Sequence, residues 1–466
     1  MRARLLPPGS KSVTNRALVL AALADSPTVI INPLRARDTL LMAAALRALG
    51  AVVDERGAPA RSGAPARSGA AETGAAAETG AAAGTGATAG ASGEEPPSWQ
   101  VIPARTSGAA VVDVGNAGTV LRFVPPVAAL ARADVEFRGD ERIASRPVGP
   151  LLAALRELGA VIDDGGRGTV PFTVRGRGAV SGGTVTLDAS GSSQLVSGLL
   201  LSAPRYDKGA EVRHVGPPVP SAPHIAMTVQ MLRAAGAQVE TEIRGRRSGN
   251  RAERSVPDTW RVYPGDLRPS AVAVEPDLSN AAPFLAAALV TGGCVTIAGW
   301  PGRTSQPAGQ MLELLTRMGA ACSPAADGMR VTGTGAIRGI SADLRDVSEL
   351  APVLAALAAL ADSPSAFTGI GHTRRHESDR IAALAAELGA LGGAVTQLPD
   401  GLLIRPRPLR ADGAVFASHD DHRLVMAAAV LGLALPGGLR VGNAATVGKT
   451  FPAFTRMWSD MLERSP

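Results

Sequence analysis

The sequence predicts an α/β or α+β fold that is built from a repeated unit of helices and strands. A helix pattern rich in Leu and Ala recurs along the chain, and each copy ends in a glycine that a short apolar strand follows. Helices alternate with strands throughout, which is typical of these two fold classes. The 466 residues are 45% hydrophobic, so we expect packed cores, and the chain length suggests two to three domains.

The repeated unit is identified by its helix ends. Close copies are ALRALGAVV at 45–53, ALRELGAVI at 154–162, MLRAAGAQV at 231–239 and LLTRMGAAC at 314–322, and a looser copy is LGALGGAV at 388–395. The glycine of each copy is expected as a C-cap, because glycine adopts a positive φ at little cost. A last helix from Pro452 to Leu462 completes six units. Units of about 75 residues are too long for a common solenoid, so we expect compact domains.

Two segments interrupt the repeated units. Residues 58–98 contain no Val, Ile, Leu, Met or Phe, so this Ala/Gly-rich insertion cannot bury a core, and we expect it to be disordered. Residues 244–258 form a second, shorter and polar loop insertion. The remaining sequence should therefore carry the whole fold and the functional site.

Composition excludes several classes of protein. The 47 basic and 41 acidic residues give a net charge of +6, which suits an anionic partner but lacks the basic blocks of a nucleic-acid tail. The two cysteines, Cys294 and Cys322, are too few for a disulfide framework or a four-cysteine zinc site. The N-terminus has no apolar signal segment, and the apolar runs near 351–361 and 424–435 are too short to span a bilayer. We therefore expect a soluble, cytoplasmic protein.

Each unit opens with a polar turn that leads into an apolar helix. The turns are PGSKS at 8–12, GNAGT at 115–119, ASGSSQ at 189–194, PDLSN at 276–280, DVSEL at 346–350 and DDHR at 420–423. Helix N-termini present free N–H groups and the positive end of the helix dipole, so six of them together would form a strong anion site. Any single turn of this kind is more simply a capped helix.

Seven motifs occur in an order that resembles the 5-enolpyruvylshikimate-3-phosphate synthase family. They are PGSKSVTNRA, GNAGT, the Arg142 segment GDERIASRP, SSQ, HESDR, DHR and GKTFP. The resemblance runs from Pro8 to about Phe454 outside the two insertions. It implies two domains, each with three βαβαββ units in an inside-out α/β barrel, in agreement with the six units. Residues 1–8 and 275–466 would form a split domain and residues 9–274 an inserted one.

The same resemblance implies the reaction. The enolpyruvyl group of phosphoenolpyruvate is transferred to the 5-hydroxyl of shikimate 3-phosphate, and phosphate is released by addition and elimination. This reaction is a step of the shikimate pathway to chorismate and the aromatic amino acids, and it is the target of glyphosate, which competes with phosphoenolpyruvate. We expect a monomer that needs no metal or organic cofactor, no nucleic acid and no membrane.

Site residues follow from the resemblance, motif by motif. Glu349 would be the base, with Asp346 as the less favoured alternative, and Glu377 with Lys11 or Lys449 would serve proton transfer at C3. Phosphoenolpyruvate would be bound by Lys11, Gly118, Arg142, Gln194, Arg380, Arg423 and Lys449. Shikimate 3-phosphate would be bound by Lys11, Ser12, Arg16, Ser192, Ser193, Gln194, Ser221, Glu349, His372 and His376, with Thr119 close by. Because both substrates are polyanions, their charges must be neutralised in a closed cleft.

The chain departs from the family pattern at four of these positions. Aspartate is usual at Glu349, lysine at His376, asparagine at His372 and tyrosine at His224, which leaves open the geometry of the base and the pH optimum. The first strand also begins later than in the family, so either the start codon is misassigned or this strand is shortened.

Two other functions remain open from the sequence. A UDP-N-acetylglucosamine enolpyruvyl transferase shares the fold but uses a cysteine on a mobile loop, whereas Cys294 and Cys322 lie in strand-like segments. A non-catalytic polyanion-binding protein, for example one for nucleic acid, would concentrate its charge in the Arg-rich stretch at 244–254. The DDHR turn contains residue types that ligate metals, but no second His/Asp set has ligand spacing, so no metal site is predicted.

Overall fold

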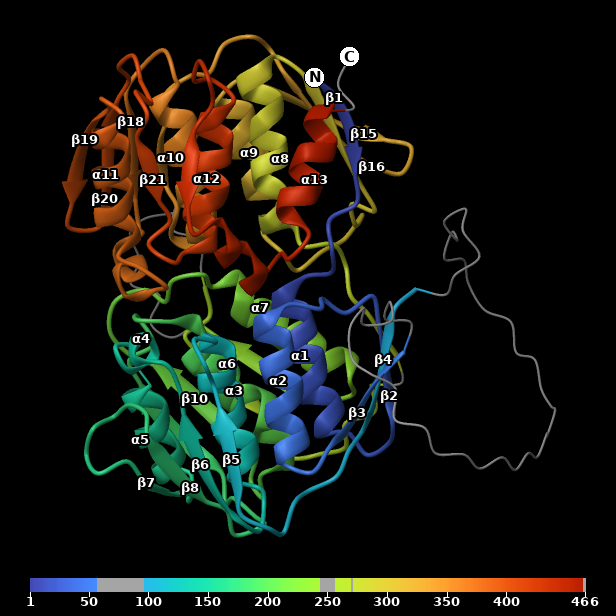
Figure 1. The fold of residues 1–466 in the computed structure, drawn as a ribbon. Helices are drawn as coiled ribbons and strands as arrows, with labels where there is room; N and C mark the ends of the chain where they lie inside the picture. The colour runs from blue at the N-terminus through green and yellow to red at the C-terminus, as the bar shows by residue number, and fades with distance from the viewer. Residues whose placement is uncertain (57–95, 147, 244–255, 270, 464–466) are drawn as a thin grey trace, which may run out of the picture.

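The computed structural model describes residues 1–56, 96–146, 148–243, 256–269 and 271–463, and these form two lobes (Figure 1). One lobe holds the blue-to-green part of the chain, and the other holds the yellow-to-red part and the N-terminal strand. The insertions expected at 58–98 and 244–258 fall almost entirely outside the described residues. Ser98 is an exception, because it begins a strand and does not belong to a disordered insertion.

The lower lobe in Figure 1 contains three four-stranded sheets of one pattern. In each sheet the first two strands run parallel and the other neighbours antiparallel. In spatial order they are β13 (Ala271–Ala273), β2 (Thr28–Ile31), β4 (Ser98–Ile102), β3 (Val52–Arg56); β5 (Ala110–Asp113), β6 (Asp134–Arg138), β8 (Phe172–Arg175), β7 (Val161–Asp163); and β9 (Gly183–Leu187), β10 (Ala210–His214), β12 (Thr259–Val262), β11 (Val239–Glu242).

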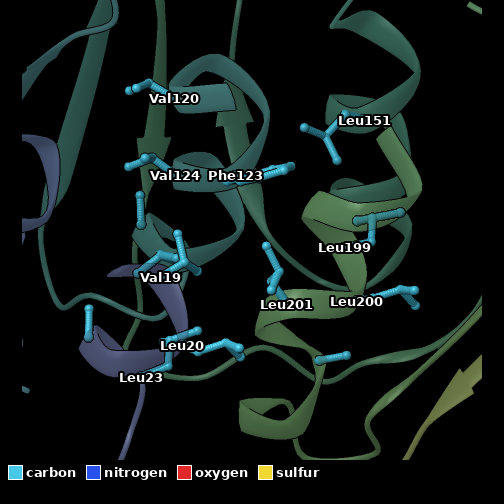
Figure 2. Packing of buried hydrophobic residues seen from close by; sticks show 14 of the residues in the cluster. Val19, Leu20, Leu23, Val120, Phe123, Val124, Leu151, Leu199, Leu200 and Leu201 are labelled. Carbon is cyan, nitrogen blue, oxygen red and sulfur yellow. The ribbon is translucent and has the colours of Figure 1, made fainter. Parts of the chain in front are cut away.

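Helices of this lobe pack their apolar faces together between the sheets. They are α1 (Lys11–Ala22), α2 (Arg37–Ala48), α3 (Gly118–Ala128), α4 (Glu141–Ala144), α5 (Gly149–Glu157), α6 (Ser193–Ser202), η1 (Ala203–Arg205) and α7 (Pro223–Ala234). Figure 2 shows Val19 of α1, Phe123 of α3 and Leu199 of α6 in the same core, and all three are fully buried. Burial of such side chains stabilises the lobe by about 1.5–3 kcal/mol per residue.

The upper lobe repeats the pattern in two sheets and ends in a shorter third one. Its strands are β1 (Arg2–Leu5), β14 (Cys294–Ala298), β16 (Gly328–Gly333), β15 (Ala320–Ala325); β17 (Ser341–Asp343), β18 (Ser365–Thr368), β20 (Gly401–Arg405), β19 (Ala394–Leu398); and the parallel pair β21 (Val415–Ala417) and β22 (Arg440–Gly442). The predicted α/β fold with repeated βαβαββ units is thereby confirmed, although the sixth unit has two strands among the described residues.

Helices of the upper lobe form a second, separate core. They are α8 (Leu278–Thr291), α9 (Ala308–Arg317), η2 (Arg345–Leu350), α10 (Ala351–Ala359), η3 (Gly371–Arg375), α11 (Arg380–Ala390), α12 (His422–Gly432), η4 (Ala444–Lys449) and α13 (Phe454–Glu463). The last of these corresponds to the helix expected at Pro452–Leu462.

The chain crosses between the lobes twice, once after β1 and once after β13. β1 at the N-terminus pairs with β14 of the upper lobe, and β13 pairs with β2 of the lower lobe. The crossings run side by side: Ser10 N donates to Glu275 O at 2.8 Å, and Asp277 N donates to Pro8 O at 2.9 Å. We therefore propose the domains as residues 9–274 and residues 1–8 with 275–466.

Five helices end in the same left-handed glycine. Gly50, Gly159, Gly236, Gly319 and Gly392 follow α2, α5, α7, α9 and α11 with φ of 102°, 100°, 95°, 109° and 92°. The predicted C-caps are thus confirmed. After α2, the N–H of Ala51 donates back to Leu46 O at 3.0 Å, as in a Schellman motif.

Replacing one of these glycines should destabilise the upper lobe. Gly319 has φ +109°, and a Cβ there would clash with the carbonyl oxygen of Ala336. We expect Gly319→Ala to lower the free energy of unfolding by more than about 1 kcal/mol. Gly309, inside α9, serves as the control, because a Cβ there would project away from the helix into open space.

Gly309→Ala should leave stability unchanged or raise it by up to about 1 kcal/mol, because alanine favours a helix over glycine. Urea unfolding followed by circular dichroism compares the two variants. Equal stability of both variants would show that the left-handed backbone at Gly319 imposes no constraint.

Candidate active site

A cavity lies between the two lobes, where helix N-termini from both lobes meet. It has a first compartment and an adjoining second compartment, and both are open to solvent. Residues in the walls of both are Lys11, Thr119, Gln194, Glu349 and Arg423. The first turns of α1, α3, α6, α8 and α12, and η2 before α10, all contribute lining residues. The predicted meeting of six helix N-termini is therefore confirmed.

Polar caps fix four of these helix starts. The caps are Ser10 of α1, Ser192 of α6, Asp277 of α8 and Asp421 of α12. Each cap side chain accepts a hydrogen bond from a backbone N–H of the first turn, which holds the turn in place. Because the positive ends of the helix dipoles meet at the cavity, the backbone itself favours an anionic ligand.

Glu377 is the central acidic group of the second compartment. Its carboxylate lies 3.2 Å from Arg146 Nη2, 3.1 Å from Arg380 Nη2 and 3.1 Å from Lys449 Nζ. Burial alone would raise the pKa of this carboxyl, but the three cations hold it well below its ordinary value. Lys449 also reaches across the lobe boundary and donates to Asn116 O at 2.7 Å. One carboxylate faces three cations, so this cluster keeps a net positive charge.

Asp421 orients Arg380 and caps the helix that begins beside Arg423. Its fully buried carboxylate accepts from Arg380 Nε at 2.7 Å and from Arg380 Nη2 at 3.2 Å. The same carboxylate caps α12 by accepting from Arg423 N at 2.9 Å. The sequence offered Asp421 only as a metal-ligand type, although its position directly before an apolar helix was a signal for a cap.

His376 lies beside this cluster and is neutral. Its Nδ1 is 3.3 Å from Arg380 Nη1, so the ring nitrogen accepts from the guanidinium. Burial lowers the pKa of His376 well below its ordinary value, and the positive charge of Arg380 lowers it further. The structure thus presents an uncharged imidazole in the wall of the second compartment.

Arg146 lies in the cavity, whereas Arg142 does not. Arg146 is 6% exposed and lines the second compartment, and its Nε has no hydrogen-bond partner among the described residues. Arg142 is half exposed, pairs with Asp420 at 2.8 Å and donates to His419 O at 3.0 Å on the rim. The structure thus places Arg142 on the rim, because α4 ends at Ala144 and the chain turns between the two arginines. The role of Arg142 as an anion ligand stays a prediction.

Gly118 lies where the side chains of Arg122, Arg146 and Gln194 converge. A Cβ at this position would lie 2.9 Å from Nη1 of either arginine and 3.4 Å from Gln194 Oε1. Arg122 donates to Gln194 Oε1 at 3.0 Å, and burial lowers its pKa to about 9. The sequence analysis missed Arg122, although a charge within the apolar run VLRFVPP, four residues after Gly118, was a usable signal.

Lys11 and Arg16 lie one turn apart on α1, as predicted, but in different surroundings. Lys11 lines both compartments, with its Nζ 3.7 Å from Asp38 Oδ2. Arg16 is buried, donates Nε to Thr228 Oγ1 at 2.7 Å and Nη1 to Ser12 O at 3.0 Å, and burial lowers its pKa to about 9. Both Arg16 and Ser12 line the first compartment.

Glu349 faces both compartments from η2. Burial raises the pKa of this carboxyl, but His224, when its ring is protonated, and the guanidinium of Arg423 outweigh that effect and hold it below its ordinary value. Glu349 is therefore ionised at neutral pH. Asp346, three residues earlier, is not among the lining residues of either compartment.

Ser221 and His372 meet each other outside these walls, on the side chain of Ser348. His372 Nε2 lies 2.9 Å from Ser348 Oγ, and Ser221 Oγ lies 3.4 Å from the same atom. Ser348 is fully buried and was not selected from the sequence. Ser192 lines the second compartment, whereas Ser193 is the buried first residue of α6.

The described residues contain no group of three His, Cys, Asp or Glu side chains that could hold a metal ion. Within the same residues, no helix has the length and apolar character needed to cross a bilayer. Cys294 and Cys322 lie in β14 and β15, as expected, and neither lines the two compartments. The cavity therefore offers no cysteine for the reaction type of the rival transferase.

Comparison with known proteins identifies the family. The family model of EPSP synthase (3-phosphoshikimate 1-carboxyvinyltransferase) matches residues 1–87 and 94–458. The curated 3-phosphoshikimate 1-carboxyvinyltransferase of Kocuria rhizophila is 46% identical over 460 residues, which cover 98% of this chain and 92% of that protein.

Solved structures agree on the fold. EPSP synthase from Acinetobacter baumannii superposes with a TM-score of 0.72 at 24% identity, covering 99% of this chain and 95% of that one. The enolpyruvyl transferase NikO from Streptomyces tendae gives a TM-score of 0.66 at 18% identity, with 99% and 94% covered. The shared fold, the cationic cavity and the identity to the curated relative lead to one conclusion: this chain belongs to the EPSP synthase family.

Proposed function

We propose that the family's reaction takes place in the cavity between the lobes, with Glu349 as the base. The chain transfers the enolpyruvyl group of phosphoenolpyruvate to the 5-hydroxyl of shikimate 3-phosphate and releases phosphate. The observation that carries the assignment of the base is the position of Glu349. It faces the same cavity as the cations around Glu377, yet among the described residues it forms no salt bridge with them.

Phosphoenolpyruvate is assigned to the second compartment. Its phosphate and carboxylate need cations, and the free Nε of Arg146 gives this arginine the role that the sequence analysis gave to Arg142. The other ligands proposed for phosphoenolpyruvate are Lys11, Gly118, Gln194, Arg380, Arg423 and Lys449. The small space above Gly118 suits a compact anion, and by the same argument glyphosate.

Shikimate 3-phosphate is assigned to the adjoining first compartment, near Ser12 and Arg16, with Ser192 and His376 proposed to contact it from the wall of the second compartment. Ser193, Ser221 and His372 stay predicted ligands. Ser221 and His372 face Ser348 and do not line the compartments. In this arrangement Glu349 lies between the two sites, where it can remove the proton of the attacking hydroxyl.

Glu377 is assigned to proton transfer at C3 as the partner of a lysine. A carboxyl whose pKa is held well below its ordinary value stays ionised, so it is a poor donor to C3 and a weak base, and its charge instead holds the lysine ammonium in place. Lys11 or Lys449 is then the proton donor at C3. We further propose that the enzyme acts as a cytoplasmic monomer, as the family resemblance implies.

The assignment of the base is tested by two matched variants on the same turn. Glu349→Gln keeps the shape of the side chain but removes the base, so kcat for phosphate release should fall by about 10²–10⁴-fold. Asp346→Asn should retain activity within about threefold, since it would change ΔG‡ by less than about 0.7 kcal/mol. Phosphate release is measured with both substrates present and with each omitted. The reverse pattern would assign the base to Asp346.

Arg146 and Arg142 provide a second pair of variants. Arg146→Ala leaves the bound anion without a buried partner, so we expect kcat/KM for phosphoenolpyruvate to fall by roughly 2–5 kcal/mol of transition-state stabilisation. Arg142→Ala removes an exposed ion pair with Asp420 and should cost no more than about 1 kcal/mol. A larger loss for Arg142→Ala than for Arg146→Ala would restore the placement made from the sequence.

The neutral state of His376 predicts how binding depends on pH. Because burial and Arg380 hold the pKa of His376 well below its ordinary value, its charge should not change between pH 7 and 9. His376→Lys would be charged throughout the same range. We therefore expect the Kd for shikimate 3-phosphate, measured by calorimetry, to follow pH in the same way for both proteins. Affinity that falls with pH only in the unaltered protein would show that a charged imidazole binds the substrate.

A further inference from the structure

His224 and Glu349 face each other across the boundary between the lobes. His224 lies in the first turn of α7 and Glu349 in η2, with His224 Nδ1 3.8 Å from Glu349 Oε1. The two side chains are 19% and 26% exposed, and both line the first compartment. Among the described residues, neither side chain takes part in another salt bridge.

Backbone contacts hold the two turns in this position. Ser221 N donates to Arg345 O at 2.8 Å, which ties the turn before α7 to the start of η2. The carbonyl of His224 accepts from Arg16 Nη2 and from Thr228 Oγ1, both at 3.0 Å. The ring and the carboxylate therefore face each other because both backbones are fixed. If His224 Nδ1 and Glu349 Oε1 approached each other by roughly 1 Å, they would form a hydrogen bond.

Charged groups on four neighbouring elements surround the pair. They are Lys11 and Arg16 of α1, Asp277 before α8, Arg380 of α11 and Arg423 of α12. Burial lowers the pKa of His224; Glu349 opposes this, and Arg16 and Lys11 add to it. Before the reaction, the pair thus consists of a neutral imidazole and an ionised carboxylate at neutral pH.

The chemistry assigned above requires a place for one proton. In the addition, the O–H bond of the 5-hydroxyl breaks, its electron pair forms the bond to C2, and C3 takes a proton from a lysine. In the elimination, C3 gives up a proton, that electron pair reforms the double bond, and the phosphate leaves with the C2–O pair. The hydroxyl proton must stay on the protein between these steps. Glu349 alone would then be a neutral acid among cations, where the carboxylate form is favoured.

We propose that His224 shares this proton with Glu349, so that the pair, and not the carboxylate alone, is the base of the reaction. His224 is a positioning residue in this scheme, because it acts on the substrate through Glu349. As the proton arrives, the pair changes from imidazole and carboxylate to imidazolium and carboxylate. The negative charge of Glu349 is thereby kept among the cations. The imidazolium then gives its proton to the released phosphate, which restores the neutral imidazole for the next cycle. The proposal rests on Glu349 being the base.

The test compares His224→Phe, which keeps a ring, and His224→Gln, which keeps a hydrogen-bonding group, with the unaltered protein. Each variant is assayed for phosphate release from pH 5 to 9 at saturating substrates. Interacting acids titrate as a pair, and in this scheme the first proton taken up by the pair resides on the imidazole, so loss of His224 should move the acidic limb of kcat to lower pH. We expect a shift of about one unit and a tenfold lower kcat in both variants, with little change in KM for shikimate 3-phosphate.

Three outcomes would overturn the proposal. A raised KM with an unmoved pH profile would make His224 a substrate contact, and a normal profile in His224→Gln would show that hydrogen bonding suffices. In a Glu349→Gln background, His224→Phe should change neither the residual kcat nor its pH dependence; a further loss there would show that His224 acts independently. Ligand-free melting temperatures control for folding. Failure of the unaltered protein to release phosphate from the two substrates would instead reject the proposed function.

Discussion

The cavity depends on one buried carboxylate that three cations from both lobes share. Arg146 comes from the lower lobe and Arg380 and Lys449 from the upper lobe, and without Glu377 their like charges would repel one another inside the protein. Removing the acid from such a buried cluster leaves charges without compensation, which commonly costs several kcal/mol. The cluster therefore joins two properties: the lobes are held together, and an excess of positive charge remains for a ligand.

The repeated fold explains why so many helix starts meet at this place. Each unit carries a helix from its first strand to its second, and three units in each lobe repeat that geometry. β1 precedes α1 but belongs to the upper lobe, and β13 precedes α8 but belongs to the lower lobe. The chain therefore crosses between the lobes twice, beside Ser10 and Asp277, the caps of α1 and α8. The crossings thus place a helix start of each lobe at the same side of the cavity.

Charge in the cavity is fixed by arginine and lysine, and the histidines are held neutral. Burial lowers the pKa of His224, His372 and His376, and neighbouring cations lower it further. A neutral imidazole can accept a proton or donate a hydrogen bond without adding to the repulsion among the cations. Histidine at these positions is therefore compatible with a strongly cationic site, and at His224 it adds a ring within 3.8 Å of the Glu349 carboxylate.

Local features of the sequence determined the repeated units of the fold and the positions of their helix starts. The helix-ending glycines, the polar caps and the period of the apolar residues act within one turn or one strand, so the six units and their helix starts could be predicted. Motif order was enough to select Lys11, Gly118, Glu349 and Arg380 as cavity residues, because each stands at a helix start that faces the cavity. Only the tertiary structure places Arg146 in the cavity wall and Arg142 on the rim, since the end of α4 sets which guanidinium points inward. It also brought Asp421 to Arg380 within the upper lobe and His224 to Glu349 across the lobe boundary, because contacts between residues 41 and 125 positions apart depend on tertiary packing and not on any local pattern.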